Sequence, residues 1–249
     1  MSVPADNYLL AVEGLTVSFD GFKAVDDLSF YVGKDELRAI IGPNGAGKTT
    51  VLDLISGRTK PSSGSILFQG NEIRSLPEHE VVRAGIGRKF QTPSVYESLT
   101  VFENLEMSYP SGRSAFGAWL FKRTKTVIEK VEEVAEAIFL KDRLSDRAEL
   151  LSHGEKQWLE IGMLLIQSPA LMMLDEPVAG MSAPEREQTA ELLKRICKQA
   201  AVVVVEHDME FVKSIAHRVM VMHQGKWLAE GSMEYVQNDP RVIDVYLGH

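Results

Sequence analysis

Hydrophobic and polar residues alternate along the first third of the chain, a pattern that predicts β-strands. The alternation covers Leu10–Phe19 and Leu28–Val32, as in strands that bury one face. The short apolar run Leu37–Ile41 indicates a strand buried on both faces, and it stops at a glycine. A helix is expected to begin near Lys48 and to end at Gly57, because glycine often terminates helices.

Helical periodicity replaces this alternation in the middle of the chain. Residues 101–146 have a helical pattern, and apolar residues recur on one face between charged ones, namely Val127, Val131, Val134, Ala135 and Ile138. Further on come an apolar run at Leu171–Leu174, a helical pattern at Pro184–Gln199 and another apolar run at Ala201–Val205. This order predicts an α/β fold whose parallel sheet is covered on both faces, with a helical insert.

Composition narrows the class of protein. The chain has 249 residues, 45% of them hydrophobic and 25% charged, which suits one large globular domain or a domain with an insert. Its net charge of −8 disfavours nucleic acid as the main partner, because basic residues bind the phosphate backbone. The single cysteine, Cys197, is typical of a reducing, cytoplasmic compartment. We find no run of about 18 apolar residues that would span a membrane, and Met1–Asn7 lacks the features of a signal peptide.

A phosphate-binding motif follows the strand predicted at Leu37–Ile41. The motif and the residue after it are Gly42, Pro43, Asn44, Gly45, Ala46, Gly47, Lys48, Thr49 and Thr50. Glycines let backbone N–H groups face phosphates, and the helix that follows adds positive potential at its N-terminus. Lys48 is expected to reach the β- and γ-phosphates, and the hydroxyl of Thr49 to bind Mg²⁺. The motif alone leaves open an ATPase, a GTPase or a small-molecule kinase, although the Asn-Lys pair of guanine readers does not occur.

Acidic residues and a histidine end the two apolar runs in the last part of the chain. Asp175 and Glu176 follow Leu171–Leu174, and strand alternation points their side chains in different directions. Asp175 suits a Mg²⁺ site, and Glu176 can polarise a water molecule towards the γ-phosphate. His207 follows the run Ala201–Val205 and can donate a hydrogen bond to the γ-phosphate, although a purely structural role is equally compatible with its position.

Together these motifs resemble the ATP-binding-cassette (ABC) family over essentially the whole chain. The run Leu151–Glu155 is similar to the family's Leu-Ser-Gly-Gly-Gln signature but carries His153 and Glu155 where the family has glycine and glutamine. The resemblance implies that Ser152 and the amide of Gly154 bind the γ-phosphate held by a second cassette. The side chain of His153 is expected to point away from the nucleotide, so that its replacement by glycine keeps most activity.

The resemblance assigns further residues one by one. Phe19 matches the aromatic residue that stacks on adenine, with Phe22 as a competitor. Gln91 matches the glutamine that contacts Mg²⁺ and couples to the membrane partner, and His207 matches the switch histidine. Residues 179–182 occupy the D-loop position without its usual aspartate, so no catalytic role is assigned to them.

The implied fold is that of a P-loop NTPase in one domain, residues 1–249. It has a mainly parallel core sheet, an N-terminal antiparallel β subdomain and a helical subdomain at about residues 92–168. The implied activity is ATP hydrolysis, with ATP and Mg²⁺ bound. The implied partners are a second ATPase subunit, identical or not, two integral membrane permease subunits and, indirectly, an extracytoplasmic solute-binding protein. The implied location is cytoplasmic, on the inner face of the cell membrane.

Two runs indicate a narrower sub-family. Residues 176–181 and the C-terminal run 239–248 resemble ATPases of branched-chain amino-acid importers, whereas Leu151–Met163 looks like the ATPase of the related urea importers. This favours urea as the solute, with a branched-chain amino acid as the alternative. Other classes stay open: a cassette ATPase acting on DNA or ribosomes, a small-molecule phosphotransferase, and a module that binds ATP without cleaving it.

Overall fold

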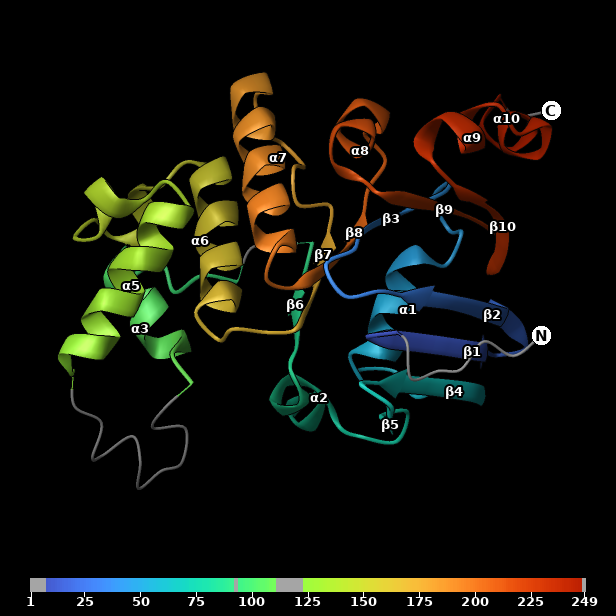
Figure 1. The fold of residues 1–249 in the computed structure, drawn as a ribbon, viewed down its shortest axis with the longest axis horizontal. Coiled ribbons are helices and arrows are strands. Elements are labelled where there is room, and N and C mark those ends of the chain that lie inside the picture. Colours follow the sequence, from blue (N-terminus) through green and yellow to red (C-terminus); the bar gives the residue numbers. More distant parts are fainter. Residues whose placement is uncertain (1–7, 92–93, 111–122, 248–249) are drawn as a thin grey trace. The chain divides into compact units, whose positions relative to one another are not determined.

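The computed structural model describes residues 8–91, 94–110 and 123–247. This chain divides into two compact units, and the helices and strands of both are labelled in Figure 1. The first unit consists of residues 1–88, 170–176 and 193–249, and the second of residues 89–169 and 177–192. The expectation about a signal peptide concerns residues 1–7, which lie outside the described residues, as do parts of the range 92–168. The single domain and the limits of its helical subdomain stay predictions.

The strands of the described residues form two sheets. Neighbouring strands of the smaller sheet are antiparallel, in the order β2-β1-β4-β5. The larger sheet has the order β10-β9-β3-β8-β7-β6, in which β3 is parallel to both β8 and β9, β7 is parallel to β8, and β10 is antiparallel to β9. The strands are β1 Leu10–Phe19, β2 Phe22–Val32, β3 Leu37–Ile41, β4 Ser63–Phe68, β5 Asn71–Glu72, β6 Ile86–Lys89, β7 Leu171–Asp175, β8 Ala201–Val205, β9 Arg218–His223 and β10 Lys226–Gly231. The expected fold class is therefore confirmed.

Helices cover both faces of the larger sheet in the first unit. Successive side chains of a strand point to opposite faces, so β3 places Ile40 in one hydrophobic core and Ala39 and Ile41 in another. The first core also contains apolar residues of β1, β2 and β4 and of helix α1. The second contains residues of α8, α9 and α10. The helices of this unit are α1 Lys48–Ile55, α2 Glu78–Ala84, α8 Met209–Ile215, α9 Met233–Gln237 and α10 Pro240–Leu247.

The second unit is helical over its described residues. Helix α5 buries the apolar face that its periodicity predicts, including Val127, Val131 and Val134. Gly162 in α6 lets the helices pack closely, because a Cβ there would lie 2.5 Å from Ile138. The elements are α3 Val101–Ser108, α5 Lys125–Ala137, the short 3₁₀ turns Lys141–Arg143 and Ala148–Leu150, α6 His153–Leu165, and α7 Ala183–Cys197, whose last residues belong to the first unit.

Several predicted boundaries are confirmed and one is wrong. Strands β1, β3 and β8 begin and end at the predicted residues, and α1 is followed by Gly57 in a left-handed conformation with φ 77°. Strand β2 begins at Phe22 rather than Leu28. Its pairing with β1 contains register shifts, and Asp26 and Asp27 interrupt the alternation on which the strand prediction relied.

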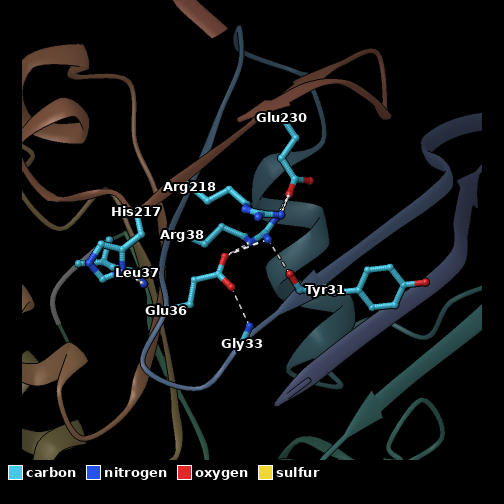
Figure 2. A network of polar contacts seen from close by, with 8 residues as sticks. All are labelled: Tyr31, Gly33, Glu36, Leu37, Arg38, His217, Arg218 and Glu230. Carbon is cyan, nitrogen blue, oxygen red and sulfur yellow. Dashed lines mark hydrogen bonds and ion pairs between the residues drawn. The ribbon is translucent and has the colours of Figure 1, made fainter. Parts of the chain in front are cut away.

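A buried arginine connects four strands at the start of β3 (Figure 2). Arg38 is 1% exposed, and its guanidinium donates to the carbonyl of Tyr31 at 2.6 Å and to Glu36 at 3.0 Å. It also forms an ion pair with Glu230, with Nη1 3.1 Å from Oε1, and the same oxygen accepts a hydrogen bond from Arg218 at 2.9 Å. The phosphate motif follows the other end of β3. The network is therefore a structural connection between β2, β3, β9 and β10, and the apolar pattern of residues 37–41 did not predict it.

Candidate functional site

The phosphate motif forms a loop closed around the amine of Lys48. The Nζ of Lys48 donates to the carbonyl oxygens of Gly42, at 2.7 Å, and Pro43, at 3.0 Å. Gly42 packs so closely that a Cβ would lie 2.3 Å from the carbonyl oxygen of Met222. Gly47 packs in the same way against the carbonyl oxygen of Ala24, at 2.4 Å. Only glycine fits at these two positions, as the motif requires.

The N-terminus of α1 presents backbone donors without a side chain to cap them. Gly47 is the N-cap residue, with φ 97°, no side chain accepts a hydrogen bond there, and the first turn contains no acidic residue. An open helix N-terminus beside a buried lysine favours an anion such as phosphate. Asn44, Gly45 and Thr49 are exposed and Thr50 is half-buried. The loop therefore fits the phosphates of a nucleotide.

The charges of the two predicted carboxylates act on Lys48. Burial lowers the pKa of the Lys48 amine, and the charges of Glu176 and Asp175 oppose that shift. Asp175 is the last residue of β7 and is 2% exposed. The structure thus brings together these acids from the end of β7 and the lysine that follows β3, as expected for strands of one parallel sheet.

Glu176 has an unusual backbone conformation. Its φ is 46°, in the left-handed region that residues with a Cβ rarely occupy. Its N–H donates to the carbonyl of Val205 in β8 at 2.9 Å, which fixes the turn after β7. Strained backbone of this kind often occurs at functional sites. Glu176 therefore leaves the strand direction at the position where the sequence predicts a water-polarising carboxylate.

His207 lies beside Glu176 at the end of β8. Its Nδ1 is 3.5 Å from Oε1 of Glu176 and 3.8 Å from Oε2 of Glu206, and its side chain is 64% exposed. Glu206 is buried and accepts hydrogen bonds from the backbone N–H groups of His207, at 2.9 Å, and Asp208, at 3.3 Å. Glu206 thus holds the segment that presents His207. The sequence analysis gave Glu206 no role, although an acid directly after an apolar strand was the available signal.

The candidate adenine-stacking residues face each other across a hairpin. Phe19 ends β1 and pairs in register with Phe22, the first residue of β2. Phe19 is 48% exposed and Phe22 is 66% exposed, so both rings present surface to solvent. The assignment of Phe19 stays a prediction.

The C-terminal helix reaches the first glycine of the phosphate loop, a contact that sequence reasoning missed. Burial raises the pKa of the Tyr246 phenol to about 12, and a hydrogen bond from the backbone of Gly42 acts in the opposite direction. Val242, also in α10, packs in the hydrophobic core with Ile41, the residue before this glycine. Helix α10 therefore supports the start of the loop.

The signature serine caps a helix in the second unit. Ser152 is the N-cap residue of α6, and its Oγ accepts from the N–H of Glu155 at 3.2 Å. The carboxylate of Glu155 accepts from the N–H of Ser152 at 2.7 Å, which completes a capping box, and also pairs with Arg143 at 2.7 Å. The unusual acid at position 155 therefore has a structural use. Gln91 also belongs to the second unit. It is exposed and lies two residues after the end of β6.

Gly154 permits a close contact at the start of α6. A Cβ at this position would lie 2.4 Å from Oε1 of Glu185. The other oxygen of Glu185 accepts from the N–H and the hydroxyl of Ser182 at 2.8 Å and 2.7 Å. The pKa of the Glu185 carboxyl is lowered, mainly by these hydrogen bonds from Ser182. Gly154 thus stands where α6 meets the start of α7.

The donor set fits Mg²⁺ bound together with a nucleotide. Among the described residues, no three His, Cys, Asp or Glu side chains gather into a metal-binding cluster. Mg²⁺ in nucleotide enzymes is held by one or two protein oxygens together with phosphate oxygens. Thr49 and Asp175 can supply such protein oxygens.

Over the described part of the chain, none of the helices has both the length and the apolar character needed to cross a membrane.

Comparisons with known proteins match almost the whole chain. The model of the ABC transporter family matches residues 25–179, and that of the branched-chain amino acid ATP-binding cassette transporter matches residues 228–249. The chain is 34% identical to the high-affinity branched-chain amino acid transport ATP-binding protein BraF of Pseudomonas aeruginosa, over 96% of this chain and 98% of that protein. The corresponding protein LivG of Escherichia coli has the same identity, 34%, and the same coverage, 96% and 98%.

A solved structure shows the same fold. The ADP conformation of an ATP-binding cassette of an ABC transporter superposes with a TM-score of 0.85 at 30% identity, over 97% of this chain and 99% of that chain. The family's ATP hydrolysis agrees with the phosphate loop and the acids around Lys48. The chain belongs to the ABC transporter family and is one of its ATP-binding, ATP-hydrolysing proteins.

Proposed function

We propose that this chain hydrolyses ATP to drive an importer of the branched-chain amino-acid type. The observation that carries the proposal is the arrangement at the ends of β3, β7 and β8. Lys48 is held inside the phosphate loop under the charges of Asp175 and Glu176, and His207 lies 3.5 Å from Glu176. A cation for phosphate, an acid for metal and an acid for water are the groups that phosphoryl transfer to water needs.

Each of these residues has a separate role in the proposed reaction. Lys48 and the N-terminus of α1 neutralise the phosphates. Thr49 and Asp175 hold Mg²⁺, which supplies further charge neutralisation when bound. Glu176 orients the attacking water and accepts its proton, and His207 donates a hydrogen bond towards the γ-phosphate. Positioning and electrostatics account for most of the catalysis in such reactions.

A second ATPase subunit completes each nucleotide site in this proposal. Ser152 and Gly154 lie at the N-terminus of α6, which can bind a phosphate held by another chain. The second subunit is a copy of this chain or a related one. Gln91 contacts Mg²⁺ and transmits the state of the site to the membrane partners.

The proposed location is the cytoplasmic face of the cell membrane, reached through partner proteins. Two integral membrane permease subunits dock near Gln91 and the helical subdomain, and an extracytoplasmic solute-binding protein acts through them. The net charge of −8 supports the absence of nucleic acid from this set.

For the solute, a branched-chain amino acid has the better support. Relatives named for branched-chain amino acid transport match over 96% of this chain, and the C-terminal family model has the same description. The comparisons give no support to the urea interpretation, which rests on Leu151–Met163 alone. The solute passes through the membrane partners, and no residue of this chain needs to touch it. Residues 151–163 therefore bear on the identity of the solute only through their resemblance to a sub-family.

Reconstitution with the membrane partners tests this function. The chain is purified with the permease subunits that bind it and placed in vesicles with the solute-binding protein. We expect leucine, isoleucine or valine to stimulate ATP hydrolysis and to enter the vesicles. Stimulation by urea alone would reverse the choice of solute, and no permease partner at all would contradict the transport function.

Replacement of the proposed water-polarising acid gives the matched negative control. Glu176→Gln removes a carboxylate and leaves Lys48 and Asp175 in place, so ATP binding should persist while kcat falls by about 10²-fold or more. Phosphate release close to that of the unaltered chain would remove Glu176 from the mechanism.

A further inference from the structure

His153, the least expected residue of the signature, contacts another segment of its own compact unit. Its Nε2 lies 3.1 Å from the carbonyl oxygen of Ala179. Ala179 belongs to the loop 177–182, which precedes α7 in the same unit. The imidazole therefore bridges the first turn of α6 and this loop.

The acceptor decides which ring nitrogen carries the proton. A carbonyl oxygen can only accept, so Nε2 of His153 must be the donor to Ala179. Nε2 of Gln157, one turn further along α6, lies 3.3 Å from the same nitrogen. Because two donors cannot bond to each other, this approach is a packing contact that closes the ring in from the helix side. A phenyl ring at position 153 would keep the ring volume and lose this N–H.

The loop is shaped to receive the imidazole. Gly180 has φ 73°, and a Cβ there would lie 3.2 Å from Cδ2 of His153 and 3.4 Å from its Nε2. A side chain at position 180 would therefore crowd the ring. Ser182 anchors the other end of the loop through Glu185, whose Oε1 occupies the space left by Gly154. Two successive residues of α6, His153 and Gly154, thus hold this loop and the start of α7.

The two segments joined by this contact lie next to residues assigned to different nucleotides. His153 directly follows Ser152, the residue assigned to the nucleotide of the second subunit. The loop 177–182 directly follows Glu176, the residue assigned to the chain's own nucleotide. A bond from His153 to Ala179 therefore connects the segments of one chain that serve two different nucleotides.

We propose that His153 is a positioning residue that couples the two ATP sites of the working dimer, an inference that rests on the proposed function. Movement of the signature turn on the partner's nucleotide is transmitted through the imidazole to the loop that follows Glu176. Hydrolysis is then cooperative in ATP. This replaces the sequence-based expectation that the side chain at position 153 is dispensable.

Two substitutions separate the hydrogen bond from the ring. His153→Phe keeps an aromatic ring beside Gly180 and removes the donor, whereas His153→Gln supplies a donor on a flexible side chain. The full-length chain, assembled with its partner subunits, is assayed for kcat, half-saturating ATP, Hill coefficient and equilibrium MgATP affinity. His79→Phe is the matched control, because His79 is an exposed histidine whose nearest ionic partner, Glu80, is 3.9 Å away.

The coupling role predicts a distinct pattern. In His153→Phe, kcat should fall about 10-fold, as expected when a carbonyl loses its donor. The Hill coefficient should approach 1 and MgATP affinity should stay within about two-fold. His153→Gln should recover at least half of the lost kcat and cooperativity, and His79→Phe should behave as the unaltered chain. Unchanged kcat and Hill coefficient in His153→Phe would overturn the inference, and so would a loss that glutamine does not rescue.

Ser152→Ala, measured in parallel, separates this inference from the proposed function. If Ser152→Ala keeps full turnover, the shared nucleotide site itself is wrong. If Ser152→Ala abolishes turnover while His153→Phe is fully cooperative, the shared site stands and only the coupling through His153 fails.

Discussion

Lys48 is held by two carbonyl oxygens of its own loop, so its charge is in place before a nucleotide arrives. Lys48→Ala should weaken MgATP binding by about 10- to 150-fold, the effect of losing one charge-assisted hydrogen bond. Lys60→Ala is a matched control, since Lys60 also donates to backbone carbonyls, those of Ser75 and Leu76, but outside the loop. Equilibrium titration with MgATP decides: equal affinities for the two variants would mean that the loop is not the phosphate cradle.

Cys197 gives a probe of the folded state at the residue scale. Burial, followed by the charges of Asp35 and Glu36, raises the pKa of its thiol to about 11 from 9.0. The thiolate fraction at pH 8 is then about 100-fold lower than in the unfolded chain, and only the thiolate is alkylated. Iodoacetamide should therefore label the native protein at least that much more slowly than the denatured protein. Comparable labelling rates for the native and denatured proteins would show that the segment around Asp35, whose carbonyl oxygen accepts from the Cys197 thiol, opens readily.

Element boundaries were predictable where a local signal was strong. Strand β8 is a continuous apolar run that stops at Glu206, and β3 is apolar except for Arg38. Gly57 follows α1 in the left-handed conformation that the residue type suggested. The start of β2 at Phe22 was missed because its pairing with β1 shifts register, which no periodicity along one strand reveals. A strand's own residues cannot encode an irregularity that arises from its neighbour.

Two of the three glycines in the loop between β3 and α1, Gly45 and Gly47, differ in the space around them. Gly45 and Gly47 both have positive φ, 80° and 97°, so a side chain strains the backbone at either. A Cβ at Gly45 meets nothing within 4 Å, whereas one at Gly47 lies 2.4 Å from the backbone oxygen of Ala24. Gly47→Ala should therefore cost about 1–3 kcal/mol more stability than Gly45→Ala, the usual penalty of overpacking.

Thermal or urea unfolding of the nucleotide-free protein measures the difference in stability between Gly47→Ala and Gly45→Ala. The absence of nucleotide matters, because both glycines belong to the candidate phosphate site and ligand binding would add its own stabilisation. Equal loss of stability in the two variants would show that Ala24 and β2 move away at little cost.

At the scale of the molecule, the sequence predicted the positions of the candidate site residues better than the contacts that hold them in place. The positions of the phosphate motif, the acids at the end of β7 and His207 could be predicted because each lies at or just after the end of a recognisable strand. The contacts that hold them could not: Glu206 acts through backbone N–H groups, and Tyr246 comes from the far end of the chain. Arg38 likewise finds Glu230 only through the sheet order. Such pairs depend on topology, which no local pattern contains.

The last prediction concerns the dimer, because Ser152 is proposed to act on the nucleotide of the other chain. One chain carries Glu176→Gln and another carries Ser152→Ala, and each should be inactive alone. In a mixed dimer, one composite site contains both substitutions. The other site combines the intact Glu176 of the second chain with the intact Ser152 of the first. Mixing equal amounts should therefore restore up to about a quarter of the turnover, since about half of random dimers are mixed and one site in two is intact.

Crosslinking must first establish that the two variants exchange subunits and that both bind ATP. If the working dimer contains a related second subunit, the substitutions are divided between the two subunits instead. A Ser152 that served its own chain's nucleotide would leave every site with a substitution, and mixing would restore nothing. Obligatory coupling between the sites would also give no recovery, because one disabled site would then silence the other. A crosslink from position 152 to ATP held by the other chain separates these cases: its formation without recovered turnover indicates coupling, and its absence contradicts the shared site.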